Sequence, residues 1–312
     1  MHARALAGGR IEATAADLGQ QDRFELDDVR RASGWRALVR GAAAELLRAG
    51  VPLRGARLLI AGDLPRGAGL ASSAALEVAT AIALIALTDA KELDLDLDRL
   101  EVAKICVRIE QRWGGAQTGM LDQLASLLGR PGSALRIDFR SLDVRPVALE
   151  LGDFKLVTLH SGERRTNASS GYNQRRAECA RACGLLGVGS LREVTLGRLD
   201  RLPAPLDRRA RHVITENERV DGAVTALGRG DLDELGALLD ASHASLRDRY
   251  EVCTPAVQAA VERLHGGGAL GARLIGGGFG GHVLGLLPPD VNVPEGAREV
   301  RPRGGARMVD SG

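Results

Sequence analysis

The most informative stretch of the sequence is Leu64-Pro65-Arg66-Gly67-Ala68-Gly69-Leu70-Ala71-Ser72-Ser73-Ala74-Ala75-Leu76-Glu77. It follows an apolar run at 58–61 that predicts a buried strand, and it leads into an Ala-rich segment at 74–87 that predicts a buried helix. Glycines and paired serines between strand and helix would place backbone N–H groups and hydroxyls at a helix N-terminus, where phosphate binds readily. No Lys follows, which excludes the GxxxxGK[ST] phosphate loop. The alternative is that Ser72 or Ser73 simply caps the helix.

Composition narrows the class of protein. The 312 residues are 45% hydrophobic and 26% charged, which is typical of a soluble globular protein with a core large enough for two domains. A net charge of +2, with acids and bases interspersed, predicts no nucleic-acid partner and no membrane partner. No apolar run suits a membrane span or a signal peptide. The four cysteines are too dispersed for a disulfide framework, so we expect reduced thiols in a cytoplasmic protein.

Periodicity predicts an α+β protein, because helices alternate with groups of adjacent strands. Helices are expected at about 31–49, 72–88, 98–113, 118–128, 170–186, 206–228, 231–248 and 254–265. Strands are expected at 57–61, 133–139, 144–151, 154–160, 272–275 and 282–287. We place the domain boundary between residues 152 and 153, which gives domains 1–152 and 153–312.

Two carboxylates are candidates for chemistry. Glu110 lies among apolar neighbours in helix 98–113, where a charge is costly unless a metal or an arginine meets it. The alternative is that Glu110 reaches solvent or pairs with Arg108 or Arg112. Asp122 lies in the first turn of the helix that begins near Thr118. It is either an acid that favours a helix N-terminus or a general base.

A glycine-rich segment, Gly276 to Gly281, contains the pattern GxGxxG. The dinucleotide-binding fingerprint requires a helix after the glycines, and a strand is expected here, so that interpretation fails. A phosphate-facing turn and a tight hairpin both remain open, and the number of glycines favours a ligand.

Seven segments resemble the GHMP family of sugar and small-metabolite kinases, and within that family the galactokinases. The resemblance extends from about Trp35 to Leu287, and the segments follow the family's order. They are 65–77, 118–124, 136–142, 168–176, 209–213, 242–252 and 271–281. The resemblance implies a two-domain fold with a ribosomal-protein-S5-like N-terminal domain and a ferredoxin-like C-terminal domain. It also implies ATP-dependent phosphorylation of a sugar hydroxyl, O1 of galactose in galactokinases, by an enzyme that uses Mg²⁺. We expect a monomer.

The resemblance also assigns roles to single residues. Asp122 matches the catalytic aspartate, Glu110 and Ser73 match the magnesium ligands, and Gly119, Asp122 and Tyr172 match residues at the sugar. The positions that match the nucleotide site are Trp35, Pro65, Gly67, Ala68, Gly69, Leu70, Ala71, Ser72 and Ser73. These roles suit phosphoryl transfer, in which positioning and charge neutralisation do most of the work.

One departure from the family pattern stands out. The family's first motif, Gly-Arg-Val-Asn-Leu-Ile-Gly-Glu-His-Thr-Asp-Tyr, has no counterpart beyond Gly9-Arg10-Ile11. We therefore expect a fold truncated at its N-terminus, which binds ATP and phosphorylates galactose poorly. The alternatives are a non-catalytic homologue that binds ATP or sugar, an inactive truncated galactokinase, and a kinase for mevalonate or homoserine.

Overall fold

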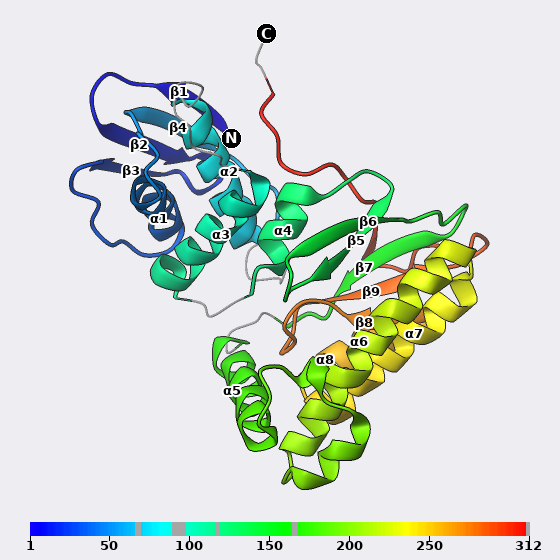
Figure 1. The fold of residues 1–312 in the computed structure, drawn as a ribbon. Helices are drawn as coiled ribbons and strands as arrows, with labels where there is room; N and C mark the ends of the chain where they lie inside the picture. Colours follow the sequence, from blue (N-terminus) through cyan, green and yellow to red (C-terminus); the bar gives the residue numbers. More distant parts are fainter. Residues whose placement is uncertain (66–69, 89–97, 116–118, 164–167, 310–312) are drawn as a thin grey trace.

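The computed structural model describes residues 1–65, 70–88, 98–115, 119–163 and 168–309, and in these residues it contains two four-stranded sheets with helices packed against them (Figure 1). The first half holds β1 (His2–Ala5), β2 (Arg10–Ala15), β3 (Gln20–Glu25), α1 (Trp35–Arg48), β4 (Ala56–Ile60), α2 (Ser72–Ala86), α3 (Arg99–Ile109) and α4 (Leu121–Leu128). A hairpin of β5 (Ser133–Asp138) and β6 (Asp143–Ala148) follows. The rest holds β7 (Lys155–His160), α5 (Ala168–Leu186), α6 (Leu206–Arg229), α7 (Leu232–Ser245), α8 (Pro255–Gly266), β8 (Gly271–Leu274), β9 (His282–Leu287) and β10 (Ala297–Val300).

The first sheet has the strand order β1-β4-β2-β3, with β2 and β4 parallel and the other pairs antiparallel. Side chains alternate along β2, where Ile11, Ala13 and Ala15 are buried and the residues between them are half-buried. That period of two turns one face of the sheet toward α1 and α2, whose apolar faces complete the core together with α3 and α4. The sheet and these helices position the starts of α1, α2 and α4.

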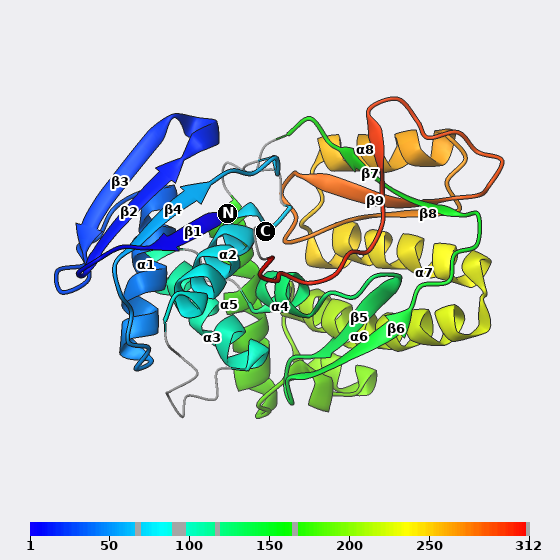
Figure 2. The same cartoon turned by 90° about the horizontal axis from the view of Figure 1, so that it is seen from above.

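The second sheet is antiparallel throughout, in the order β10-β7-β9-β8. Helices α7 and α8 pack on it, and Figure 2 shows both helices beneath its strands. Thr254 caps α8, because its hydroxyl accepts from the backbone N–H of Val257, and Pro255 occupies the first turn. Within the described part of the chain, no helix has the length and apolarity needed to cross a bilayer.

The α+β class is confirmed by this arrangement. The elements expected between residues 31 and 287 all occur, with ends shifted by a few residues. The helices expected at 98–113 and 231–248 each end in a π-helical turn, at Glu110–Gly114 and Leu246–Tyr250. The strands β1, β2 and β3 lie where the sequence analysis predicts none, and they supply most of the first sheet.

The end of the described chain returns to the first half of the molecule, as Figure 2 shows near α4. The N–H groups of Gly305 and Ala306 donate to the carbonyls of Gly129 and Ser126, at 2.7 Å each. The Arg99 guanidinium donates to the carbonyl of Ala306 at 2.9 Å. Residues 303–306 therefore pack against α3 and α4. The domain boundary between residues 152 and 153 stays a prediction.

Candidate active site

The start of α2 opens into a cavity of about 740 Å³. Its walls come from the β1–β4 sheet, the starts of α1 and α2 and the π-helical turn that follows α3. Trp35, Ser72 and Ser73, which sequence analysis assigns to the nucleotide site, all line this one cavity, together with Trp113 and Gly114. The structure thus brings three of the predicted nucleotide-site residues together.

Backbone geometry leaves the first turn of α2 open to a ligand. Ala71 precedes the helix in the left-handed conformation (φ 56°, ψ 32°), and no side chain caps the helix. Ser72 and Ser73 lie inside the first turn, so the expectation that one of them is a simple cap is wrong. The uncapped N–H groups at the start of a helix attract anions, and a residue held in a costly conformation is found at binding sites more often than elsewhere.

The loop before α2 is described only in part. Pro65 is exposed and Leu70 is half-buried. Gly67, Ala68 and Gly69 lie outside the described residues, so their expected contact with phosphate stays a prediction.

Trp35 is the first residue of α1 and lines the cavity. Its indole N–H donates to Gln20 Oε1 at 2.9 Å, and the Arg36 guanidinium lies 5.2 Å from the ring centre. Both contacts hold the indole in place. Trp113 packs against Gly41 of α1, where a side chain larger than hydrogen would clash with the ring. Two aromatic residues therefore flank the cavity, which suits a planar base.

Two carboxyl side chains contact Gln123, the residue that follows Asp122 in α4. The Gln123 amide nitrogen donates to Glu77 Oε2 at 3.1 Å and to Glu110 Oε2 at 2.9 Å. The two hydrogens of the Gln123 amide thus link α2 to the π-helical turn that follows α3. Arg108 and Arg112 lie instead against the carboxylate of Glu45, so the structure does not place them as the partners of Glu110.

Glu77 is fully buried, and this burial raises its pKa to about 8. The negative charge of Glu110 adds to the increase, and that of Asp122 contributes less, while the hydrogen bond from Gln123 opposes it. Glu77 is therefore mostly protonated at neutral pH. Among the described residues, nothing hydrogen-bonds to Glu77 Oε1 or to Gln123 Oε1.

Asp122 is exposed and lies in the first turn of α4, beside the buried Gln123. An acidic side chain in this position interacts favourably with the partial positive charge of the helix N-terminus. Gly119, which is also exposed, precedes the helix. This placement presents the carboxylate to a ligand and keeps its neighbour anchored in the core.

Tyr172 is separated in sequence from these groups and lies in the first turns of α5. It packs near Gly277, where a Cβ would approach its ring to 3.2 Å, and the Phe279 ring lies against Gly171. In Figures 1 and 2 the starts of α4 and α5 and the β8–β9 turn lie where the two halves of the molecule meet. The role of Tyr172 at a sugar stays a prediction.

The glycines between β8 and β9 have a structural explanation. Gly276, Gly278, Gly280 and Gly281 all have positive φ, which other residues adopt at a cost. A Cβ at Gly278 would lie 2.5 Å from Val252. Backbone conformation and close packing therefore account for the number of glycines without a ligand.

The chemistry of the donors fits Mg²⁺, which prefers oxygen ligands and is usually held by one or two side chains, phosphate oxygens and water. Ser73 offers an exposed hydroxyl one helical turn before Glu77, and Glu110 is oriented by Gln123. The described residues contain no group of three or more His, Cys, Asp or Glu side chains arranged for a metal. A magnesium ion here would accordingly depend on the nucleotide for most of its ligands.

Sequence reasoning missed Glu77 and Gln123 as parts of the site. Glu77 carried a signal, since a single carboxyl inside an apolar helix needs a partner. Gln123 carried a weaker signal, its place beside Asp122 in the resembling segment 118–124, because a neutral amide in a helix is common.

Comparisons with known proteins give a consistent result. The family described as GHMP kinases N terminal domain matches residues 37–130, and the one described as GHMP kinases C terminal matches residues 223–306. A galactokinase from Mycobacterium tuberculosis is 42% identical over 289 residues, which cover 90% of this chain and 78% of the relative. A galactokinase from Thermotoga petrophila is 39% identical over 261 residues, which cover 83% of this chain and 73% of the relative.

Solved structures, together with the two family matches, confirm the expected two-domain GHMP-type fold. The crystal structure of Lactococcus lactis galactokinase complexed with galactose matches with a TM-score of 0.87 and 31% identity, over 97% of this chain and 84% of that one. A mevalonate kinase structure matches with a TM-score of 0.65 at 18% identity, over 97% and 88% of the two chains, which shows a shared fold.

Proposed function

Because the chain belongs to the galactokinase family of GHMP kinases, we propose that it transfers the γ-phosphoryl group of ATP to the O1 hydroxyl of galactose. The observation that carries this proposal is the 740 Å³ cavity, which joins Trp35 to the open start of α2. A planar base and a phosphate chain would each find matching surfaces there.

The nucleotide half of the site is proposed as follows. The adenine lies against Trp35, and the phosphates meet the N–H groups at the start of α2 and the hydroxyls of Ser72 and Ser73. This arrangement uses a helix N-terminus for an anion, and it would satisfy donors that no side chain caps.

The sugar half of the proposal centres on Asp122. Its carboxylate accepts or orients the proton of the attacking hydroxyl, while Gly119 and Tyr172 contact the sugar. Phosphoryl transfer needs little covalent help from the protein, so positioning the hydroxyl in line with the γ-phosphorus is the main requirement. Gln123 anchors the helix turn that carries Asp122, because its amide is held by two buried or half-buried carboxyl groups.

Magnesium belongs to the same proposal, with Ser73 and Glu110 as its protein ligands. The ion would neutralise charge on the phosphate oxygens. Two observations support Glu110 as a ligand: it stands at the end of α3, and Gln123 fixes the direction of its carboxylate.

The test of the catalytic role is Asp122→Asn in a coupled assay of ADP release that depends on galactose. We expect turnover to fall by a factor of about 10² to 10⁴, the range usual for loss of a general base, with little change in ATP affinity. The matched control is Asp233→Asn, which removes an exposed acid from the first turn of α7. Wild-type turnover in Asp122→Asn, or equal losses in both variants, would return Asp122 to the role of a helix-dipole acid.

The test of the metal role is Glu110→Gln, measured by calorimetry with and without magnesium. We expect affinity for Mg-ATP to fall far more than affinity for metal-free ATP, because a neutral amide is a poor magnesium ligand. Glu101→Gln, on the same helix and paired with Lys104, is the control. Equal affinity losses under both conditions would show a structural role for Glu110.

The proposal also includes a monomeric enzyme in the cytoplasm. The four cysteines are free thiols in the structure, which accords with a reducing compartment. Sedimentation at micromolar concentration would test the monomeric state.

A further inference from the structure

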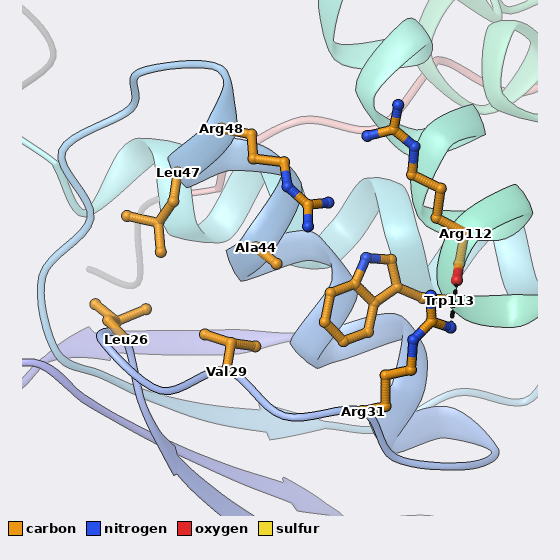
Figure 3. A pocket seen from close by; sticks show the side chains of 8 residues that line it. All are labelled: Leu26, Val29, Arg31, Ala44, Leu47, Arg48, Arg112 and Trp113. Atoms are coloured by element: carbon orange, nitrogen blue, oxygen red, sulfur yellow. Dashed lines mark hydrogen bonds between the residues drawn. The ribbon is translucent and has the colours of Figure 1, made fainter.

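A second cavity, of about 560 Å³, is lined by residues of α1, by the segment after β3 and by Arg112 and Trp113 (Figure 3). One part of its wall is apolar and comes from Leu26 and Val29, in the segment after β3, and from the indole of Trp113. The other part carries the guanidinium groups of Arg31, Arg48 and Arg112. The two cavities share Trp113 and no other lining residue.

Positive charge exceeds negative charge around this cavity. The buried carboxylate of Glu45 pairs with Arg48, with Arg112 at 3.1 Å and with Arg108 at 3.6 Å. It also accepts from the Trp113 indole N–H at 3.2 Å. Arg31 adds a further guanidinium and has a neutral partner, since it donates to the carbonyl oxygen of Arg112 at 2.7 Å. Three guanidinium groups thus pair with one carboxylate, and Arg31 adds a fourth positive charge.

The arginines that line the cavity retain donors for a ligand. A guanidinium has five N–H groups, and within the described residues the hydrogen bonds of Arg31, Arg48 and Arg112 use one nitrogen of each. The side chains of Arg48 and Arg112 are 58% and 53% exposed. Glu45 offsets one of these positive charges. The planar forks of the guanidinium groups match phosphate and carboxylate oxygens.

We propose that this cavity is a second ligand site, which binds a small organic anion with a phosphate or carboxylate group attached to an apolar or planar body. The anionic group contacts guanidinium groups among Arg31, Arg48 and Arg112, of which Arg31 lies over the Trp113 ring at 5.6 Å. The body lies against Leu26, Val29 and Trp113. Glu45 holds two of the arginines in position from beneath, so the site is preformed. The apolar wall distinguishes it from a surface where inorganic ions collect.

The experiment titrates phenyl phosphate, inorganic phosphate and phenol into the full chain by calorimetry, without nucleotide or magnesium. We expect phenyl phosphate to bind at millimolar concentration or below, inorganic phosphate to bind more weakly and phenol to give no signal. Arg31→Met should weaken phenyl phosphate binding about tenfold, the effect expected for one lost hydrogen bond to a charged group. Arg31→Lys should recover part of that loss.

Two controls make the result specific. Arg30→Met changes the neighbouring arginine, which is exposed, pairs with Asp28 and does not line the cavity, and it should leave binding unchanged. Ser73→Ala alters the nucleotide cavity and should also leave binding unchanged. Because Arg31 is exposed and does not pair with Glu45, its variants should fold, and circular dichroism would confirm this.

Three results would overturn the proposal. The first is no binding of phenyl phosphate at millimolar concentration. The second is equal affinity in the wild type and Arg31→Met. The third is a loss of binding in Ser73→Ala, which would place phenyl phosphate in the nucleotide cavity.

Discussion

Gln123 joins two acidic side chains that reach it from different helices. One, Glu77, is fully buried in α2, and the other, Glu110, stands where α3 gives way to the π-helical turn. One amide nitrogen donates to both carboxyl groups, so a substitution at Glu77 should alter the positions of Glu110 and the neighbouring Asp122. A buried polar network of this kind stabilises a fold only when its members stay paired.

Glu77→Gln should change how stability depends on pH. The pKa of Glu77 is about 8 in the folded protein and about 4.3 in an unfolded chain. Between these values the folded state keeps a proton that the unfolded state has lost, so the free energy of unfolding falls as pH rises. Glutamine does not titrate, so in the presence of a chelator the variant should lose less stability than the wild type between pH 5 and 8, by on the order of 1–3 kcal/mol.

Urea unfolding at pH 5, 6.5 and 8 measures this difference, with Glu101→Gln as a control on an unrelated carboxyl. Parallel pH profiles for the wild type and Glu77→Gln would show that Glu77 titrates normally in the folded state. In that case burial and the charge of Glu110 would not control its protonation.

Among the helices, α2 begins with a costly backbone conformation that leaves its first turn open to a ligand. Ala71 adopts a left-handed conformation that costs an L-residue about 1–2 kcal/mol. The turn nevertheless leaves the first N–H groups of the helix uncapped by a side chain and directed toward the nucleotide cavity. Binding of phosphate there would offset the cost.

Ala71→Gly should relieve this cost. Glycine adopts positive φ freely but loses about 0.5–1 kcal/mol through its greater freedom in the unfolded chain, so we expect a net gain of up to about 1 kcal/mol. Ala75→Gly, inside the same helix, should instead cost about 1 kcal/mol. Denaturant unfolding distinguishes them, and a loss of stability in Ala71→Gly equal to that in Ala75→Gly would contradict the account of the turn.

Most elements could be predicted from the sequence because their patterns are strong. Helix α2 is an apolar run, and α8 begins with Thr254 and Pro255, which mark a helix start. The strands β1 and β3 could not be predicted in this way, since both are short and mostly exposed. β2 did carry a signal in the alternation of Ile11, Ala13 and Ala15 with polar residues. The assembly of Trp35 with α2 depends on that missed sheet.

At the scale of the whole molecule, the C-terminal segment ties two distant parts of the chain together. Residues 303–306 lie beside α4, and Gly305 approaches the backbone so closely that a Cβ would lie 2.2 Å from the carbonyl oxygen of Leu127. No sequence pattern predicts this return, because it depends on where the second sheet ends in space. It supports the C-terminal end of the helix that carries Asp122 and Gln123.

Gly305→Ala should disturb this contact. We expect a loss of about 1–3 kcal/mol, since backbone must shift to admit the methyl group. Gly304→Ala is a matched control, because the nearest atom to its added Cβ is 3.9 Å away. Thermal unfolding, with hydrogen exchange at the amides of Gly305 and Ala306, would measure both variants, and equal behaviour would show that the segment does not pack as described.

We expect this chain to phosphorylate galactose. Sequence reasoning alone expects weak activity, because the family's first motif is missing, whereas membership of the galactokinase family leads us to expect turnover. Phosphorus NMR on the chain with ATP, magnesium and galactose decides between them. We predict that galactose 1-phosphate and ADP accumulate in equal amounts, and that glucose in place of galactose gives little product. ATP binding by calorimetry without any galactose 1-phosphate would contradict the account.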